Sequence, residues 1–178
     1  MKIKITNKYL YLILLCFITL TSSAQEVNWL TWEEAAKLAE TEKEPKKIFI
    51  DVYTDWCGWC KKMDKDTFQN AEVAAYMSKN YYMVKLDGER KEAIEFKGKT
   101  FKFVPRPAPS RGYHEFAAAL MQGKVNYPTT IFLDEKMNML SPLPGYQKPE
   151  PFLKVAKYFG ENIHKDKNWQ AYEGEEGK

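Results

Sequence analysis

The chain has 178 residues, 44% of them hydrophobic and 29% charged, which suits one domain with a hydrophobic core. It contains 27 basic and 24 acidic residues, and three of the basic ones, Lys2, Lys4 and Lys8, lie within the first eight positions. Without these three lysines the net charge is near zero, which gives no electrostatic case for binding nucleic acid or anionic lipid.

The first 24 residues have the pattern of a secretory signal peptide. An apolar run, Tyr9–Leu20, follows the lysines, and Ser22-Ser23-Ala24 offers a cleavage site that would leave Gln25 as the mature N-terminus. The run is shorter than the roughly 20 residues that span a bilayer, although a retained N-terminal anchor is the alternative. Because Cys16 would leave with the signal, only two cysteines remain in a protein that we expect to be periplasmic or otherwise exported.

The first predicted elements of the mature chain are a helix and a strand. Thr31-Trp32-Glu33-Glu34 is a capping box, which predicts a helix over about Trp32–Lys43 that Pro45 ends. Ile48–Tyr53 is a nearly continuous apolar run, typical of a strand buried on both faces, and Asp51 is its exception.

A second strand follows after two helices. Cys57-Gly58-Trp59-Cys60 stands where the first strand gives way to a helix that we expect to reach about Lys65. Asn70 can cap a further helix, Ala71–Lys79, and Tyr81–Leu86 reads as a second buried strand. Strand, helix and strand in this order predict a parallel pair with a right-handed crossover.

The segment after the second strand is predicted to be irregular, and regular elements follow it. Glycines and prolines from Asp87 to Asn126 predict irregular structure around one helix, Tyr113–Gln122. Beyond this segment we expect a strand at Thr129–Leu133, its hairpin partner at Met137–Leu140, and an amphipathic helix at about Glu150–Phe159.

The fold class is therefore α/β, with a central mixed β-sheet flanked by helices. We expect a single domain over residues 25–178, with its core at about 46–160, an insertion at about 88–126 and a flexible tail at 173–178.

The two remaining cysteines form a Cys-x-x-Cys pair at a helix start. The free N–H groups and the positive end of the helix dipole stabilise a thiolate at the first cysteine, while the second lies deeper, one turn later. We therefore predict that Cys57, at the exposed helix start, is the nucleophile and that Cys60 resolves the mixed disulfide. A structural zinc site would need four ligands, with only His114 and His164 left to supply them, and a permanent Cys57–Cys60 disulfide would close too short a loop to stabilise much. We expect no metal and no cofactor.

Acidic residues near the pair are the second group of candidates. A carboxylate in a buried strand costs free energy unless it has a role there. Asp51 could exchange a proton with Cys60. A salt-bridged core acid is the alternative, and Lys85 on the neighbouring strand is the expected partner in both cases. Asp64, four residues after Cys60, can also approach that sulfur, or it is an ordinary solvated helix acid.

Three segments together resemble the thioredoxin superfamily. They are Asp51-(x5)-Cys57-Gly58-Trp59-Cys60-Lys61, Met83–Asp87 and Tyr127-Pro128-Thr129. The stretch Tyr53–Val73 is similar to the C-terminal thioredoxin-like domain of the bacterial periplasmic thiol–disulfide interchange protein and to its small exported relatives.

The resemblance implies a thioredoxin fold, in which the insertion precedes the cis-proline strand. It makes Asp51 and Asp64 the acids near the cysteines, Lys85 the partner of Asp51, and Pro128 a cis proline. The surface that binds substrate is expected to comprise Trp56, Gly58, Trp59, Tyr127, Pro128 and Thr129.

The implied function is that of a protein-disulfide reductase supplied with electrons by a membrane donor protein of the thiol–disulfide interchange type. A disulfide oxidase or isomerase, and a non-catalytic thioredoxin-like binding module, are the alternatives. Trp59 stands where the common thioredoxin pair has proline, and residues 88–126 are longer than the family usually shows, so the redox potential and the choice of partner do not carry over.

Overall fold

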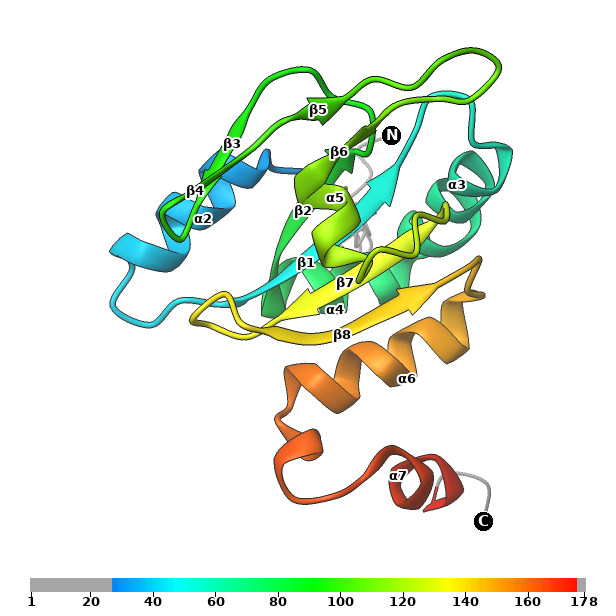
Figure 1. Cartoon of the computed structure of the whole chain (residues 1–178). Helices are drawn as coiled ribbons and strands as arrows, with labels where there is room; N and C mark the ends of the chain where they lie inside the picture. The colour runs from blue at the N-terminus through cyan, green and yellow to red at the C-terminus, as the bar shows by residue number, and fades with distance from the viewer. Residues whose placement is uncertain (1–26, 176–178) are drawn as a thin grey trace, which may run out of the picture.

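The computed structural model describes residues 27–175, so the predicted signal peptide lies outside the described residues. A four-stranded sheet with the order β2-β1-β7-β8 forms the centre of the molecule (Figure 1). Its strands are β1 (Lys47–Tyr53), β2 (Tyr81–Asp87), β7 (Thr129–Leu133) and β8 (Met139–Pro144). β1 runs parallel to β2, and β7 runs antiparallel to both β1 and β8, so the sheet is mixed, which confirms the predicted fold class.

Helices cover the sheet as the sequence predicts, with some additions. They are α2 (Trp32–Thr41), α3 (Gly58–Met63), α4 (Ala71–Asn80), α5 (Glu115–Leu120), α6 (Pro149–Gly160) and α7 (Trp169–Glu175), together with a π-helical turn η1 (Asp64–Phe68) and a 3₁₀ turn η2 (Ile163–Lys165). The capping box at Thr31 and Glu34 is present, and the Asn70 side chain accepts hydrogen bonds at the start of α4.

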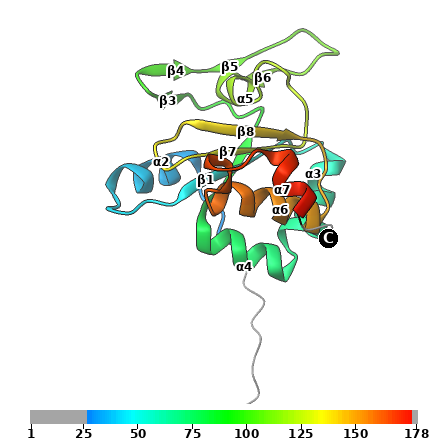
Figure 2. The same ribbon diagram turned by 90° about the horizontal axis from the view of Figure 1, so that it is seen from below.

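The sheet separates two hydrophobic cores because side chains alternate along each strand. In β1, Ile48, Ile50 and Val52 belong to the first core with residues of α2 and α5, whereas Phe49 belongs to the second core with residues of α4 and α6. Figure 2 shows α5 on one side of the sheet and α4 and α6 on the other. By the same alternation Asp51 points to the second side, where α3 and η1 also pack.

Residues 88–126 are more ordered than the sequence predicts. They contain two short hairpins, β3 (Ile94–Phe96) with β4 (Lys99–Phe101) and β5 (Phe103–Val104) with β6 (Tyr113–His114), followed by α5. Ile94, Phe101 and Phe116 are buried in the first core. The expectation of irregular chain around one helix was therefore wrong for these strands, whose apolar side chains are held by contact with distant elements rather than by a strong local pattern.

Several boundaries also differ from the prediction: Tyr113 and His114, expected at the start of a helix, form β6, and α5 covers only Glu115–Leu120. β8 begins at Met139 rather than Met137, because Met137 adopts a positive φ of 58° in a turn that the Asp134 side chain holds through the backbone N–H groups of Lys136 and Asn138. The flexible tail was expected from Glu173, yet α7 continues to Glu175, and Tyr172 is buried against the second core. No helix within residues 27–175 is long and apolar enough to cross a membrane.

Candidate active site

Cys57 and Cys60 are joined by a disulfide at the start of α3. Cys57 is the N-cap residue, and its Sγ accepts a hydrogen bond from the backbone N–H of Cys60 at 3.0 Å. Each cysteine is only 4% exposed, so the expectation that Cys57 is the exposed one was wrong. The helix N–H group, and not solvent exposure, distinguishes the two sulfurs.

The buried Asp51 forms an ion pair with Lys85 behind this disulfide. The two residues are register partners in β1 and β2, and Lys85 Nζ lies 2.8 Å from Asp51 Oδ2. Lys85 Nζ also lies 2.8 Å from Asp64 Oδ1, so one ammonium group connects the sheet to η1. The ring of Trp29 covers the same ammonium group at 4.5 Å.

Burial and charge act differently on the two partners. Asp51 is 1% exposed, its Oδ1 has no hydrogen-bond partner within the described part of the chain, and burial raises the pKa of this carboxyl despite the opposing effect of Lys85. Burial alone would lower the pKa of Lys85, but the carboxyl groups of Asp51 and Asp64 outweigh it and raise that pKa above its ordinary value. Lys85 therefore keeps its charge, while Asp51 can hold a proton at a higher pH than an ordinary aspartate.

A small pocket connects Cys60 with Lys85 and Asp64. Its volume is about 150 Å³, and Cys60, Asp64 and Lys85 line it together with residues 53–55 and Lys61. Asp51 does not line the pocket, but it is hydrogen-bonded to Lys85, which does. A second pocket of about 950 Å³ lies between α4, α6 and α7, and neither cysteine lines it.

Two exposed tryptophans flank the disulfide. Trp56 is 48% and Trp59 is 59% exposed, whereas the cysteines between and beside them are buried. Trp56 packs edge-on against Tyr127 with ring centroids 5.8 Å apart, and Trp59 packs against Tyr146 at 5.5 Å. Flat apolar rings around a buried disulfide form a surface that a polypeptide chain can cover.

The segment Tyr127-Pro128-Thr129 lies beside Trp56, and its Tyr127–Pro128 peptide bond is cis. Thr129 pairs with Val52 of β1, which brings the start of β7 next to the end of β1. Tyr127 packs over Gly88, where an added Cβ would lie 2.3 Å from the tyrosine oxygen. The ring position of Tyr127 thus depends on the absence of a side chain at residue 88.

Four contacting residues were not predicted from the sequence. Trp29 covers Lys85, Tyr146 covers Trp59, Glu89 accepts a hydrogen bond from Trp56 Nε1 at 3.0 Å, and the Arg111 guanidinium lies 5.0 Å from the Trp56 ring centre. Each approaches from a part of the chain that is distant in sequence, so no local motif marks it. Among residues 27–175 no group of three or more histidine, cysteine, aspartate or glutamate side chains could hold a metal ion.

Comparison with protein sequences finds relatives over parts of the chain. Residues 17–103 match the family described as Thioredox_DsbH, protein of unknown function, DUF255. Spermatogenesis-associated protein 20 of Homo sapiens is 33% identical over 69 residues, which are 39% of this chain and 9% of that protein. The thiol:disulfide interchange protein DsbD of Vibrio vulnificus (strain CMCP6) is 27% identical over 140 residues, 76% of this chain and 20% of that protein. The chain thus matches only a minor part of these relatives.

Solved structures share the fold. A Bacteroides thetaiotaomicron protein described as a candidate disulphide-isomerase superposes with a TM-score of 0.52 and 26% identity, covering 77% of this chain and 95% of that one. The DsbH oxidoreductase superposes with a TM-score of 0.52 and 19% identity, over 74% of this chain and 83% of the other. The expected thioredoxin fold is thereby confirmed.

Proposed function

We propose that this chain, which has the thioredoxin fold and is similar in part to DsbD and to the Thioredox_DsbH family, is an exported reductase of protein disulfides. The observation that carries the proposal is the Cys57–Cys60 disulfide at a helix start, in front of a buried aspartate–lysine pair. The disulfide is the oxidised form, and the dithiol is the form that reduces a client.

The reaction is two successive thiol–disulfide exchanges. The Cys57 thiolate attacks one sulfur of the client disulfide, which forms a Cys57–client mixed disulfide and releases the other client sulfur as a thiolate that takes up a proton. Cys60, after losing its proton, attacks Cys57 Sγ, which restores the Cys57–Cys60 disulfide and releases the second client thiol. Two electrons pass to the client, and an external dithiol protein must return two electrons for each turnover.

The charged groups near Cys60, of which Asp51 is buried, suit the proton transfers of the second exchange. Cys60 lines the same pocket as Lys85 and Asp64, and Lys85 is hydrogen-bonded to Asp51 at 2.8 Å. Because the pKa of Asp51 is raised, its carboxylate is a stronger base than an ordinary aspartate. We propose that Asp51 accepts the proton that Cys60 loses. Lys85 and Asp64 position Asp51 and Cys60 for this transfer.

Export and the membrane donor belong to the same proposal. The signal-like segment 1–24 would direct the chain out of the cytoplasm. Outside the cytoplasm, in an oxidising compartment, a dithiol needs a source of electrons. A membrane protein of the thiol–disulfide interchange type would supply them, and protein disulfides would be the substrates.

The reduction potential tests the direction of electron flow. A strong oxidant of this fold holds its nucleophilic thiolate at a very low pKa, whereas the nearby carboxyl groups of Asp51 and Asp64 work against a thiolate. Lys85 is shared between these two carboxyl groups and so offsets only part of their charge, and Lys62 is paired with Asp66 instead. We expect a reduction potential of about −270 mV rather than about −120 mV. The difference of roughly 150 mV corresponds to about 7 kcal/mol for a two-electron couple.

Equilibration in glutathione or dithiothreitol buffers, followed through the fluorescence of Trp56 and Trp59, measures this potential. A value above about −160 mV lies closer to the oxidant and would assign the chain to disulfide formation instead. An absence of any turnover on a reducible protein would favour the non-catalytic binding module.

A further inference from the structure

A basic arm within the segment 88–126 reaches Trp56, the residue before Cys57. We define this basic arm as residues 97–113, which contain five lysines and arginines and no aspartate or glutamate: Lys97, Lys99, Lys102, Arg106 and Arg111. Residues 105–111 between β5 and β6 are all exposed. Figures 1 and 2 both place the loop between β5 and β6 at the same end of the molecule as the start of α3.

Arg111 fixes the arm to the active site. Its guanidinium lies 5.0 Å from the ring centre of Trp56, the residue immediately before Cys57. A guanidinium stacked on an aromatic ring uses its face and leaves its N–H groups free at the edge, in the geometry that fits a carboxylate. Within the described residues no carboxylate lies at ion-pair distance from Arg111, and Arg106 likewise stacks on Tyr113 without an ion pair.

Three acidic residues also lie near Trp56, all of them outside the basic arm. Glu89 accepts the hydrogen bond of Trp56 Nε1, and the Asp87 carboxylate accepts one from the backbone N–H of Glu89. Asp55 is exposed on the other side of Trp56 in the sequence. The charged side chains of the arm itself are all positive, and Arg111 is the one that lies over Trp56.

We propose that the basic arm selects clients that carry carboxylate side chains next to their disulfide, and that Arg111 is the residue that binds them. The inference rests on the proposed function, because it names the class of polypeptide that the Cys57–Cys60 dithiol reduces. A carboxylate bound by Arg111 lies over Trp56 and so brings the adjoining client disulfide to Cys57. The cysteines perform the exchange, and Arg111 determines which substrate is presented to them.

Three peptides of equal length, each closed by one internal disulfide, test this preference. They differ only in the two residues that flank one cysteine, which are glutamate, glutamine or lysine. The second-order rate constant for reduction by the pre-reduced protein is measured for each at low and high salt. We expect the glutamate peptide to react roughly two- to fivefold faster than the glutamine peptide, and high salt to abolish this ratio.

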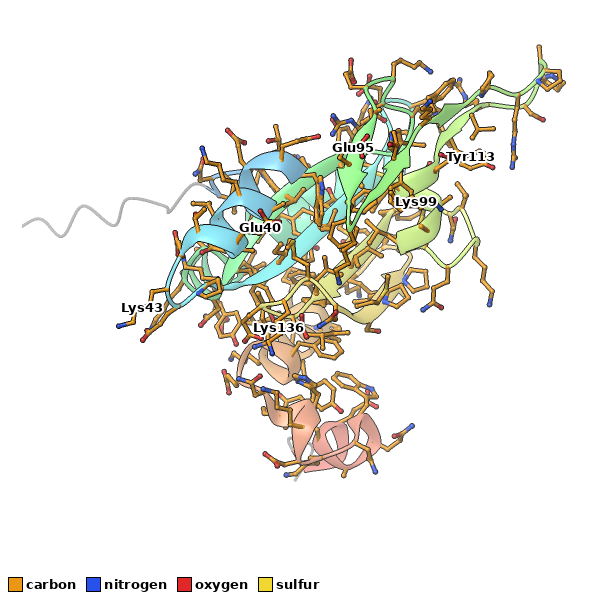
Figure 3. All side chains as sticks on the ribbon, turned by 60° about the vertical axis from the view of Figure 1, so that its left-hand side comes forward. Glu40, Lys43, Glu95, Lys99, Tyr113 and Lys136 are labelled. Carbon is orange, nitrogen blue, oxygen red and sulfur yellow. A yellow bond between two sulfur atoms is a disulfide. The ribbon has the colours of Figure 1, made fainter. Side chains whose placement is uncertain are left out.

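The variants assign the preference to a residue. In Arg111→Ala the glutamate-to-glutamine ratio should fall to near one, and Arg111→Lys, which keeps the charge without the planar stack, should retain part of it. Lys136→Ala is the matched control, because it removes an exposed positive charge at the β7–β8 turn. Figure 3 shows Lys136 well away from Tyr113 at the base of the arm. The control should keep the full ratio.

The outcomes separate this inference from the proposed function. Equal rates for the three peptides, with active reduction of all of them, would overturn the role of Arg111 and leave the reductase intact. No reduction of any peptide would overturn the proposed function itself. Binding to phosphatidylglycerol vesicles that Arg111→Ala abolishes, without a change in the peptide ratio, would assign the arm to a membrane surface and also overturn the inference.

Discussion

Among the described residues, the helix backbone donates a hydrogen bond to the sulfur of only one of the two equally buried cysteines, and from that asymmetry we predict the order of the exchange. The N–H of Cys60 points to Cys57 Sγ, so a thiolate is stabilised at Cys57 and not at Cys60. We expect Cys60→Ser to accumulate mixed disulfides with clients, because Cys57 still attacks and nothing resolves the product. Cys57→Ser should accumulate none. Non-reducing electrophoresis of both variants after incubation with a disulfide-containing protein measures this, and trapping by Cys57→Ser alone would reverse the roles.

Asp51 should make the stability of the fold depend on pH. Burial raises its pKa in the folded protein, so the folded chain holds this proton more tightly than the unfolded chain does. The resulting stabilisation is fully present below the unfolded pKa of about 4 and is lost as the pH rises through the folded value.

The Asp51→Asn variant removes this dependence. Lys85 retains Asp64 as a partner, so the variant should fold, and its free energy of unfolding should rise relative to the wild type between pH 4 and pH 8. Each unit by which the pKa is raised corresponds to about 1.4 kcal/mol. Urea denaturation of the oxidised, disulfide-bonded proteins at both pH values checks this, with the exposed Asp166→Asn as the control.

The Asp51→Asn variant should also slow release of the client by about 100-fold, and an unchanged release rate would leave Asp51 as a structural acid.

At the scale of elements, Gly88 connects the segment 88–126 to the cis-proline strand. Its backbone N–H donates to Tyr53 O at 2.8 Å, and its carbonyl accepts from the N–H of His114 at 2.7 Å. The ring of Tyr127 lies directly over it. A single glycine therefore holds the end of β1, the end of β6 and the residue before Pro128 together.

A methyl group at this position should disturb all three. In Gly88→Ala the new Cβ would meet the Tyr127 side chain at 2.3–2.7 Å, so the ring that packs against Trp56 must shift. We expect a loss of about 1–3 kcal/mol in the free energy of unfolding and a slower reduction of protein disulfides. Chemical denaturation and a turnover assay measure both effects. Gly174→Ala is the control, because an added Cβ meets nothing within 4 Å there, and equal stability of the two variants would contradict the packing argument.

For the molecule as a whole, the sequence predicted best those elements whose pattern is local. The capping box at Thr31, the apolar runs of β1 and β2, and the Cys-x-x-Cys pair at a helix start all appear in the structure. So does the Asp51–Lys85 pair, because register partners in a parallel pair lie opposite each other. The fold class followed from the order of these elements.

The parts that depend on distant contacts could not be predicted in this way. Phe101 and Phe116 are buried only because β4 and α5 pack against the first core, and nothing in residues 97–113 indicates that Arg111 lies over Trp56. The exposure of Cys57 was also mispredicted, since a helix start exposes a side chain only if no other segment covers it. These features belong to the tertiary structure rather than to any short pattern.

The participation of residues 88–126 in the first core limits how the protein can be engineered. Ile94, Phe101 and Phe116 complete the surface that β1 and α2 present, so a chimera that transplants the whole segment into another thioredoxin would have to carry its supporting face with it. Residues 105–111 are different, because every one of them is exposed and none belongs to either core. A library that randomises only this stretch would therefore test the proposed client selection while leaving the scaffold untouched.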